Sequence, residues 1–306
     1  EHSGQELAAR LWFFWIACGF LREGRYYLDR ALARGGKGRP HRLALWACAF
    51  AAGSQGDVDI ADTLAAQCRA DALADGDTLL ATYAAETQAM VLAIRGDLDA
   101  AVDLMRECLA YYHGLDGIDA GLLRTMPMLG VTHVMRGDFD AALAMAPQSQ
   151  QLCERLGERW QRSYVDYFVG MAMHGRNEPA RAVEHLTAAI RTKHQFHDVV
   201  GLVMCIEPLA GACADLGDGT RAARLLGAGQ QLWRSFGLPL FGSPFHSTEH
   251  QRTEQRARHL LGAEQYERAF DDGRSMDVDR IVEYAVAGTR GPHPRPEPEA
   301  PDPLTP

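Results

Sequence analysis

The feature that most constrains the fold is a short stretch that recurs along the chain. It reads Arg-Gly-Asp-Leu-Asp-Ala-Ala at residues 95–101 and returns as Arg-Gly-Asp-Phe-Asp-Ala-Ala at residues 136–142. A looser copy, Gln-Gly-Asp-Val-Asp-Ile-Ala, occupies residues 55–61. Weaker copies place glycines at Gly24, Gly175 and Gly217. Successive turn glycines lie 32 to 42 residues apart, and self-similarity at such a period indicates a solenoid of stacked units.

The chemistry of this stretch predicts a helix, a tight turn and a second helix. Glycine can adopt the left-handed conformation that ends a helix, because it has no Cβ to clash. The aspartate that follows stands where the next helix begins, and its carboxylate can accept a hydrogen bond from a free backbone N–H. An alanine five residues after most of these glycines lets the two helices approach closely. The residues assigned to the turns are Gly24, Gly56, Asp57, Gly96, Asp97, Gly137, Asp138, Gly217 and Asp218.

Two other interpretations of the turn residues have to be weighed. An Arg-Gly-Asp sequence can be a recognition motif, which needs an exposed loop in a secreted protein. Aspartates two residues apart, such as Asp97 and Asp99, can serve acid–base chemistry or bind calcium. Because both features recur at the repeat boundaries, capping of helix ends is the favoured interpretation.

The apolar pattern between the turns extends the hairpins along the chain. First helices are predicted near residues 42–54, 78–94, 120–135, 159–174 and 198–216, and second helices near 58–74, 98–113, 139–156, 179–194 and 220–236. The first unit is predicted to hold helices over 7–21 and about 25–33. The sequence therefore predicts an all-α fold, a right-handed superhelix of about six helical hairpins over residues 1–240. Capping helices are expected over 241–287, and a proline-rich linker over 288–306.

Charge and cysteine content exclude several classes of function. Lys and Arg number 31 against 40 Asp and Glu, a formal net charge of −9, so the chain lacks the basic surface that drives nucleic-acid binding. The seven cysteines are scattered and no CxxC motif occurs, which favours buried free thiols in a reducing, cytoplasmic compartment. The longest apolar run, residues 11–21, is shorter than the roughly 20 residues that span a bilayer. No membrane partner is expected.

The turn spacing and the two ends of the chain carry a family resemblance. The turn glycine, the apolar residue two positions later and the alanine resemble the second half of a tetratricopeptide repeat, and Leu129-Gly130 resembles part of its first half. The aromatic stretch Leu-Trp-Phe-Phe-Trp at 11–15 is followed by Glu-Gly-Arg at 23–25. Together they look like the first repeat after the ATPase module in LuxR-type bacterial transcriptional regulators of the STAND class. Residues 303–306 resemble the opening of a LuxR-type helix-turn-helix domain.

This resemblance implies a fragment of a larger cytoplasmic regulator. In that family an NTPase module precedes the repeats and a helix-turn-helix domain often follows, and both would be absent from this sequence. ATP would bind the absent NTPase module. Aromatic residues on all sides of the first helix also indicate that an upstream domain packs on it. The expected partners are the parent's own NTPase and DNA-binding domains, together with an unknown small-molecule effector or protein.

A search for catalytic and metal-binding motifs predicts neither an enzyme nor a metal site. No GxSxG sequence, Cys/His nucleophile signature or glycine-rich nucleotide fingerprint occurs. The Gly-Lys pair at 36–37 lacks the spacing and the Ser or Thr of a phosphate-binding loop. The spacing of His194 and His197 could place both on one helix face, and the same holds for His246 and His250. The sequence shows no third metal ligand for either pair. No cofactor is therefore expected in this chain.

What remains is the inner surface of the superhelix, which is built from the first helices. Arginines beside aromatic residues could hold an anionic or planar effector, because a guanidinium pairs with carboxylates and phosphates and also stacks on rings. The ligand-binding residues expected there are Trp46, Tyr83, Glu86, Arg124, Arg162 and Glu207, with Phe50, Met90 and Met173 on the same face.

The expected function is a non-catalytic effector- or partner-binding regulatory domain. By resemblance, it would couple binding to the ATPase and DNA-binding modules of the parent. Three alternatives stay open. The inner-face residues could serve packing between repeats, the chain could be a protein-interaction or oligomerisation scaffold with no small effector, or an enzyme site could be assembled between repeats. The sequence offers no support for the last.

Overall fold

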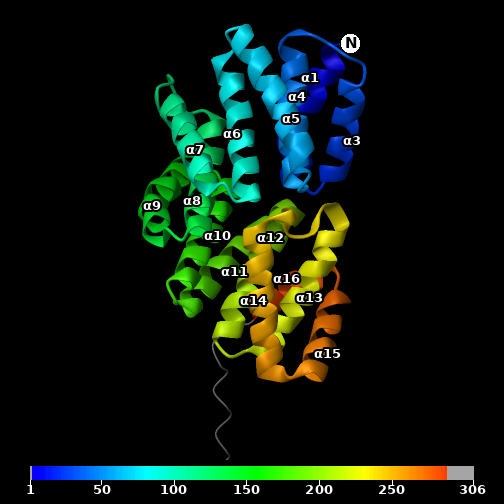
Figure 1. Cartoon of the computed structure of the whole chain (residues 1–306), viewed down its shortest axis with the longest axis vertical. Helices are drawn as coiled ribbons and strands as arrows, with labels where there is room; N and C mark the ends of the chain where they lie inside the picture. The colour runs from blue at the N-terminus through cyan, green and yellow to red at the C-terminus, as the bar shows by residue number, and fades with distance from the viewer. Residues whose placement is uncertain (1, 288–306) are drawn as a thin grey trace, which may run out of the picture.

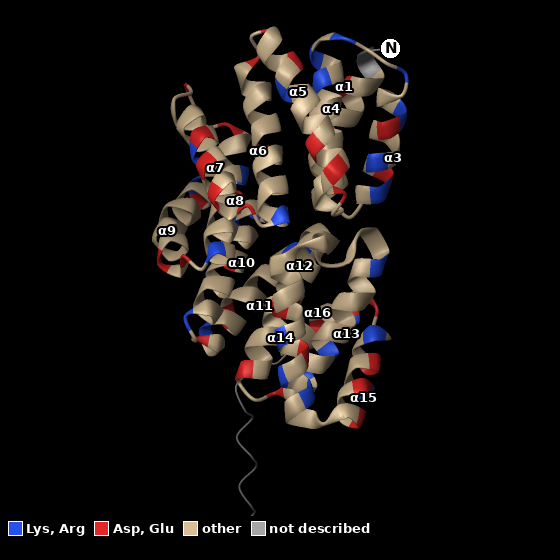
Figure 2. Ribbon diagram, in the orientation of Figure 1, with Lys and Arg blue, Asp and Glu red and all other residues tan. Residues whose placement is uncertain are grey.

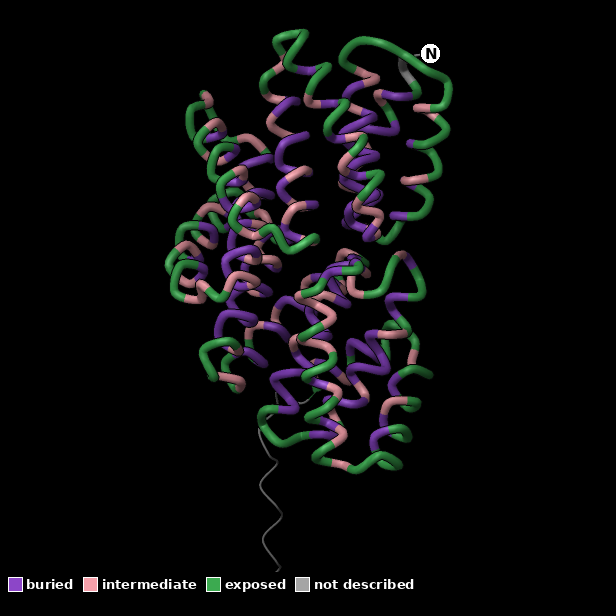
Figure 3. The backbone as a smooth tube through the Cα atoms, viewed as in Figure 1, coloured by how far each residue is buried: buried purple, intermediate pink, exposed green. Residues whose placement is uncertain are grey.

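The computed structural model describes residues 2–287 and consists of consecutive helical hairpins over most of that length. The hairpins pair α4 (Gly38–Ser54) with α5 (Val58–Ala74), α6 (Thr78–Arg95) with α7 (Leu98–His113), α8 (Ala120–Arg136) with α9 (Phe139–Leu156), α10 (Trp160–Gly175) with α11 (Pro179–Phe196), and α12 (Val199–Asp215) with α13 (Gly219–Phe236). The predicted all-α repeat fold is confirmed, and most helix ends agree with the predicted bounds to within two residues. Buried residues follow the facing sides of the helices, and the turns are exposed (Figure 3).

Glycines in the left-handed conformation end the helices at four of the turns. Gly56, Gly96, Gly137 and Gly217 have φ angles of +82°, +93°, +87° and +84°. At Gly96 the turn is closed by two backbone bonds, from Gly96 N–H to the Ala93 carbonyl at 3.1 Å and from Asp97 N–H to the Leu92 carbonyl at 2.9 Å. A side chain at such a position would be strained, which explains why glycine recurs in the repeat.

The aspartates after these glycines hold the N-cap position, but most of them do not act as expected. The carboxylate of Asp218 accepts a hydrogen bond from Arg221 N–H at 2.9 Å. Asp57, Asp97 and Asp138 make no side-chain capping bond. Asp57 accepts from Arg25 at 3.2 Å and Asp138 from Arg136. The capping prediction is therefore wrong in its hydrogen bond at three of the four turns, and at two of them the carboxylate pairs with an arginine instead.

The second aspartate of each repeated stretch links neighbouring hairpins. Arg136 bonds Asp99 of the preceding turn at 2.9 Å, and Arg176 bonds Asp140 at 3.0 Å. Arg95 reaches Asp59 in the same way at 2.7 Å. Each of these carboxylates is highly exposed, so each pair contributes little to stability. Their regular spacing nevertheless explains why both Arg and the second Asp recur with the period of the repeat.

Two of the weaker copies differ from the repeated turn. Gly24 lies inside α3 (Leu21–Leu32), where a Cβ would come 2.4 Å from that of Trp15. The turn of the first unit is instead at Gly19, with φ +84°. Gly24 is thus a close-packing position, and the prediction of a turn there is wrong. Gly175 is the last residue of α10, and Asn177 takes the left-handed conformation with φ +63°.

The first unit also differs from the predicted hairpin, because its first helix is interrupted. It consists of α1 (His2–Arg10) and α2 (Trp12–Ala17), which precede α3. Two rings of α2 face other hairpins of the same chain. Trp12 lies 5.7 Å from the Trp46 ring, and Phe13 lies 5.2 Å from the Trp160 ring. These two rings are therefore partly covered by the chain itself, and the expectation that an upstream domain packs on the first unit stays a prediction.

The hairpins follow an arc that brings the sixth back to the second (Figure 1). After α13 comes a short 3₁₀ turn, η1 (Pro239–Gly242). The backbone N–H of Leu238 donates to the Gln55 carbonyl at 2.8 Å, and the Gln55 side chain donates to the Phe236 carbonyl at 3.1 Å. Arg22 also donates to the Arg234 carbonyl at 3.1 Å. The arc is therefore closed by specific contacts between segments far apart in the sequence.

Three helices cover the end of the arc. They are α14 (Pro244–Leu261), α15 (Ala263–Arg274) and α16 (Val278–Ala287). The backbones of α13 and α15 touch, because a Cβ on Gly227 would meet the Phe270 carbonyl oxygen at 2.0 Å and one on Gly273 would meet that of Arg224 at 1.9 Å. The division into a repeat region and a cap remains a prediction. The predicted linker and the resemblance at residues 303–306 lie outside the described residues.

Charge and hydropathy of the described helices agree with the composition. Basic and acidic residues are interspersed over the visible face rather than gathered into one basic surface (Figure 2). Within residues 2–287, no helix combines the length and apolar character needed to cross a membrane.

Candidate ligand cavity

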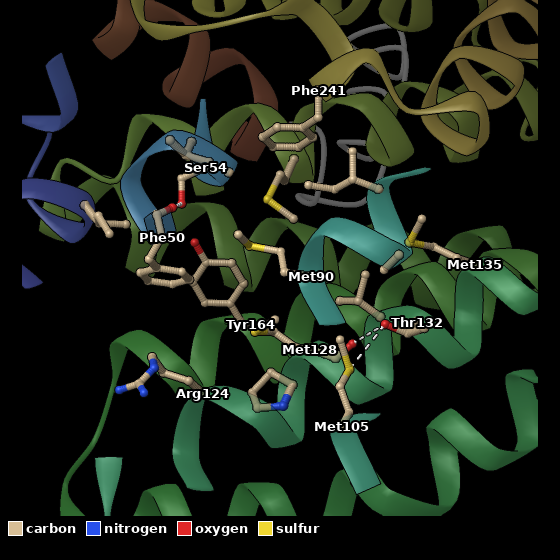
Figure 4. Close-up of a pocket in the computed structure, with 18 of the residues that line it drawn as sticks. Phe50, Ser54, Met90, Met105, Arg124, Met128, Thr132, Met135, Tyr164 and Phe241 are labelled. Atoms are coloured by element: carbon tan, nitrogen blue, oxygen red, sulfur yellow. Dashed lines mark hydrogen bonds between the residues drawn. The ribbon is translucent and has the colours of Figure 1, made fainter. Parts of the chain in front are cut away.

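A cavity of about 150 Å³ lies at the centre of the arc. Its walls come from α2, from the first helices of the second to sixth hairpins, from α7, and from η1 and α14 (Figure 4). The lining residues are Ile16, Phe50, Gly53, Ser54, Met90, Ala93, Ile94, Met105, Arg124, Pro127, Met128, Val131, Thr132, Met135, Trp160, Gln161, Tyr164, Val200, Met204, Phe241 and His246. A molecule placed here would contact five hairpins, the N-terminal unit and the cap at once.

The cavity wall is predominantly apolar and rich in methionine. Five methionines line it, namely Met90, Met105, Met128, Met135 and Met204. The hydroxyls of Ser54 and Thr132 also line it, but each donates to the backbone of its own helix, at 2.9 and 2.8 Å. Methionine side chains are flexible and polarisable, so they adapt to the shape of an apolar guest. Such a wall favours an apolar ligand over a sugar or a nucleotide.

The one arginine in the wall is committed to a buried ion pair. Arg124 donates from Nε and Nη2 to the two carboxylate oxygens of Glu86, at 2.9 and 3.1 Å. The Tyr112 hydroxyl donates to the same carboxylate at 3.0 Å. The side chains of Arg124 and Glu86 are only 3% and 2% exposed. Burial raises the pKa of the Glu86 carboxyl, and Arg124 opposes that shift.

Three aromatic rings enclose the Arg124 guanidinium. Its central carbon lies 5.0, 5.2 and 4.8 Å from the ring centroids of Trp12, Trp46 and Tyr83, within the range of cation–π attraction. The Tyr83 hydroxyl in turn donates to Asp119 at 2.8 Å. In Figure 4 the guanidinium points away from the methionines. Arg124 therefore ties the first, second, third and fourth units together, and its charge is already balanced before any ligand binds.

A second buried ion pair lies behind Tyr164, at the junction of α10, α11 and α12. Lys193 Nζ lies 3.4 Å from Asp198 Oδ2, and both side chains are fully buried. Asp198 also accepts from Trp160 Nε1 at 2.8 Å and from the Tyr164 hydroxyl at 3.1 Å. Desolvation lowers the pKa of Lys193, and Asp198 opposes that shift. This network fixes the two aromatic side chains that α10 contributes to the cavity wall.

His246 of α14 faces the cavity without a hydrogen-bond partner. Both of its ring nitrogens are buried, and neither has a partner among the described residues. Its ring packs edge-on against Phe241 and Phe245, at 5.7 and 5.3 Å between centroids. Burial lowers the pKa of His246 to about 4. The ring is therefore neutral at pH 7, and it offers one N–H donor and one acceptor nitrogen.

A more polar cleft of about 430 Å³ adjoins the cavity, and Met135 and His246 line both. Glu207 of α12 stands in this cleft with two partners. It accepts from Trp233 Nε1 at 3.2 Å, and its other oxygen lies 2.9 Å from Nδ1 of His250 on α14. The hydrogen bond to Glu207 raises the pKa of His250. Glu207 therefore ties the cap to the last hairpin.

The His250–Glu207 contact predicts a pH-dependent contribution to stability. Because the folded-state pKa of His250 lies above the unfolded value of about 6.5, the contribution is fully present below that pH. It is lost as pH rises through the folded-state pKa. Urea unfolding at pH 5.5 and 8.5 should show His250→Asn costing about 1 kcal/mol more at the lower pH. In a Glu207→Gln background this difference should vanish, and an equal difference there would contradict the assignment.

The residues expected on the inner face are separated by the structure. Phe50, Met90 and Arg124 line the central cavity, Trp46 and Tyr83 line a separate recess beside Arg124, and Glu207 lines the polar cleft. Arg162 pairs with Asp166 on its own helix, and Met173 is buried. The idea that Arg124 holds an anionic effector is not supported by this geometry, because Glu86 already occupies the Nε–Nη2 edge of the guanidinium and balances its charge.

Sequence reasoning missed several residues that shape the site. Phe241 and His246 follow the last repeat, where the periodic pattern stops, so nothing in the repeat pointed to them. Lys193 carried a usable signal. Leu186, Ile190 and Lys193 follow one another at spacings of four and three residues, so they share one face of the helix, and the first two are buried. A charged residue on such an apolar face indicates a buried partner.

Comparison with known proteins gives a coarse placement. No family model matches the chain. Over 121 residues, 40% of this chain, it is 29% identical to proteins described as HTH-type transcriptional regulators of Mycobacterium bovis and Mycobacterium tuberculosis. The matched segment spans only 13% of the length of those regulators. The chain is thus similar to a small part of much longer proteins.

A search of solved structures finds helical repeat proteins. One is a Rap protein complexed with competence and sporulation factor, with a TM-score of 0.60, 10% identity, and coverage of 92% of this chain and 77% of that one. The other is a tetratricopeptide repeat protein from Parabacteroides merdae, with a TM-score of 0.43, 12% identity, and coverage of 92% and 98%. At such low identity, the likeness to the Rap protein shows the fold, a tetratricopeptide-like helical repeat.

Proposed function

We propose that this chain is a non-catalytic, effector-binding regulatory domain of a LuxR-type bacterial transcriptional regulator. The observation that carries the proposal is the central cavity, which every hairpin from the second to the sixth helps to enclose. The effector binds there, and its binding is coupled to the ATPase and DNA-binding modules of the parent. ATP acts in the parent's NTPase module and not in this chain.

The coupling follows from the position of the cavity. A ligand that contacts Ile16 near the N-terminus and His246 in the cap interacts with both ends of the arc. If it fits one curvature of the hairpins better than another, it shifts the population toward that curvature by the difference in affinity. The ends of the repeat region then move relative to one another, and the modules attached to them sense that movement.

The comparisons lend support at two levels. The relatives that share 29% identity are described as HTH-type transcriptional regulators, which agrees with a regulatory role for the parent. The Rap protein that shares the fold is seen with a bound factor, competence and sporulation factor. A helical repeat of this general shape can therefore serve as a receptor.

Thermal unfolding against a panel of candidate effectors tests the proposal. The panel contains sugars, nucleotides, acyl thioesters, amino acids and small neutral aromatics. A ligand at about 100 times its dissociation constant stabilises the native state by about 2.7 kcal/mol, so its shift is easily measured. Val131→Phe, which places a ring in the cavity wall, should abolish the shift, and Arg162→Ala, on a residue paired with Asp166, should retain it.

The rival function is a protein-interaction or oligomerisation scaffold. It is favoured by exposed aromatic side chains on α2 and α3 and the turn between them, where Phe14, Phe20, Tyr26 and Tyr27 are 41 to 54% exposed. Exposed aromatic clusters are typical of docking surfaces. If no member of the panel shifts the unfolding temperature, effector binding is contradicted and this surface becomes the functional site.

A further inference from the structure

The central cavity carries a more specific inference about its ligand. Its volume of about 150 Å³ matches an apolar cavity known to take up benzene, which is about 150 Å³. The guest is therefore about the size of one aromatic ring with a small substituent. Disaccharides and nucleotides exceed this size, and no rearrangement of the wall is needed for the smaller guest.

The wall favours an aromatic ring over an aliphatic chain. In Figure 4 the side chains of Met90 and Met128 lie beside the rings of Phe50 and Tyr164. Thioether sulfurs make favourable contacts with ring edges, and aromatic rings prefer edge-to-face or offset partners. A guest ring among these side chains gains both kinds of contact, whereas an alkyl group gains only burial.

The polar groups of the wall favour a neutral guest that carries one hydrogen-bonding group. Arg124 is neutralised by Glu86 at 2.9 Å, so it does not attract an anion strongly. His246 presents two buried nitrogens with no partner among the described residues. A buried donor or acceptor left unpaired is unfavourable, so a hydroxyl or amino group that reaches this ring satisfies it.

We propose that the cavity binds a small neutral aromatic molecule of the phenol class, with the ring among the methionines and the hydroxyl hydrogen-bonded to His246. This inference rests on the proposed effector-binding function and specifies the chemical class of the effector. His246 also borders the polar cleft, so the hydroxyl lies at the boundary between the apolar and polar spaces. The ligand is recognised by one directional contact and a shape, without any charged group.

Calorimetric titration with phenol and with toluene tests this assignment directly. The two probes have nearly the same size and differ by the hydroxyl. We expect the ratio of phenol affinity to toluene affinity to be about five-fold higher in the wild-type chain than in His246→Phe, the factor that one neutral hydrogen bond provides, because the methyl group of toluene gains its burial in both. This variant keeps a ring and removes both nitrogens, so it removes the hydrogen bond and retains an aromatic wall. In Val131→Phe, neither probe should bind.

The possible outcomes distinguish the proposal of a phenol-class ligand from the broader proposal of effector binding. Toluene binding to the wild-type chain about ten-fold more tightly than phenol would overturn the role of His246 without recourse to any variant, because that is the penalty for burying a hydroxyl without a partner. Binding of neither probe, while a sugar, nucleotide or thioester stabilises the chain, would overturn the phenol-class ligand and leave the effector-binding function intact. If no compound of either set binds, both proposals fail. An unchanged ratio of phenol to toluene affinity in folded His246→Phe would likewise contradict the assignment.

Discussion

Replacing Glu86 by alanine is expected to lower the free energy of unfolding by about 3–5 kcal/mol. The substitution leaves the Arg124 guanidinium, only 3% exposed, without its counter-charge and leaves the Tyr112 hydroxyl without its acceptor. Removing one partner of a buried pair costs far more than the pair itself contributes, because the remaining charge stays desolvated. Urea denaturation followed by circular dichroism, compared with wild type at pH 7, measures the loss.

The matched control replaces both partners with apolar residues of similar size. Glu86→Leu combined with Arg124→Met removes both charges, so no uncompensated ion remains in the interior. The double variant should be markedly more stable than Glu86→Ala, although it loses the cation–π contacts to Trp46 and Tyr83. A double variant as unstable as the single one would mean that packing around these side chains, rather than charge, dominates.

The repeat architecture could be predicted from the sequence because its determinants are local. A glycine with positive φ, followed by an N-cap aspartate, ends one helix and starts the next without help from distant residues. That is why the turns at Gly96 and Gly137 are where the period places them, with φ +93° and +87°. The aspartate hydrogen bonds were not predictable in this way, because Asp138 bonds Arg136 and Asp99 bonds the same arginine from the neighbouring hairpin.

The first unit and the cavity could be predicted only in part, because long-range contacts decide them. Gly24 has the surroundings of a turn glycine in the sequence, yet it is required by the approach of Trp15. Arg124 was predicted for the inner face and lines the central cavity. Its partner Glu86 is 38 residues away, and the sequence gave no sign that these two charges neutralise each other. His246 enters the site only because the arc closes, and closure depends on contacts such as Leu238 to Gln55.

Truncation of Trp12 to alanine is expected to destabilise the chain by about 3 kcal/mol, the lower end of the range for a buried aromatic, since this ring is only partly buried. Trp12 contacts Trp46 at 5.7 Å and Phe50 at 6.0 Å, and it covers one face of the Arg124 guanidinium at 5.0 Å. Its loss removes apolar burial and exposes a buried cation to water on one side. Equilibrium urea unfolding gives the change, and hydrogen exchange over α2 reports whether this helix detaches.

Phe14 provides the control for the Trp12 prediction, because it lies on the same short helix and its side chain is 41% exposed. Its ring stacks on that of Phe20, with 4.5 Å between the ring centroids. Phe14→Ala should therefore cost less than about 1 kcal/mol, since it removes a partly solvated contact and leaves no internal cavity. If both substitutions lower the free energy of unfolding equally, the prediction is contradicted. The packing of Trp12 against the second and fourth hairpins would then not be what holds the N-terminal unit in the arc.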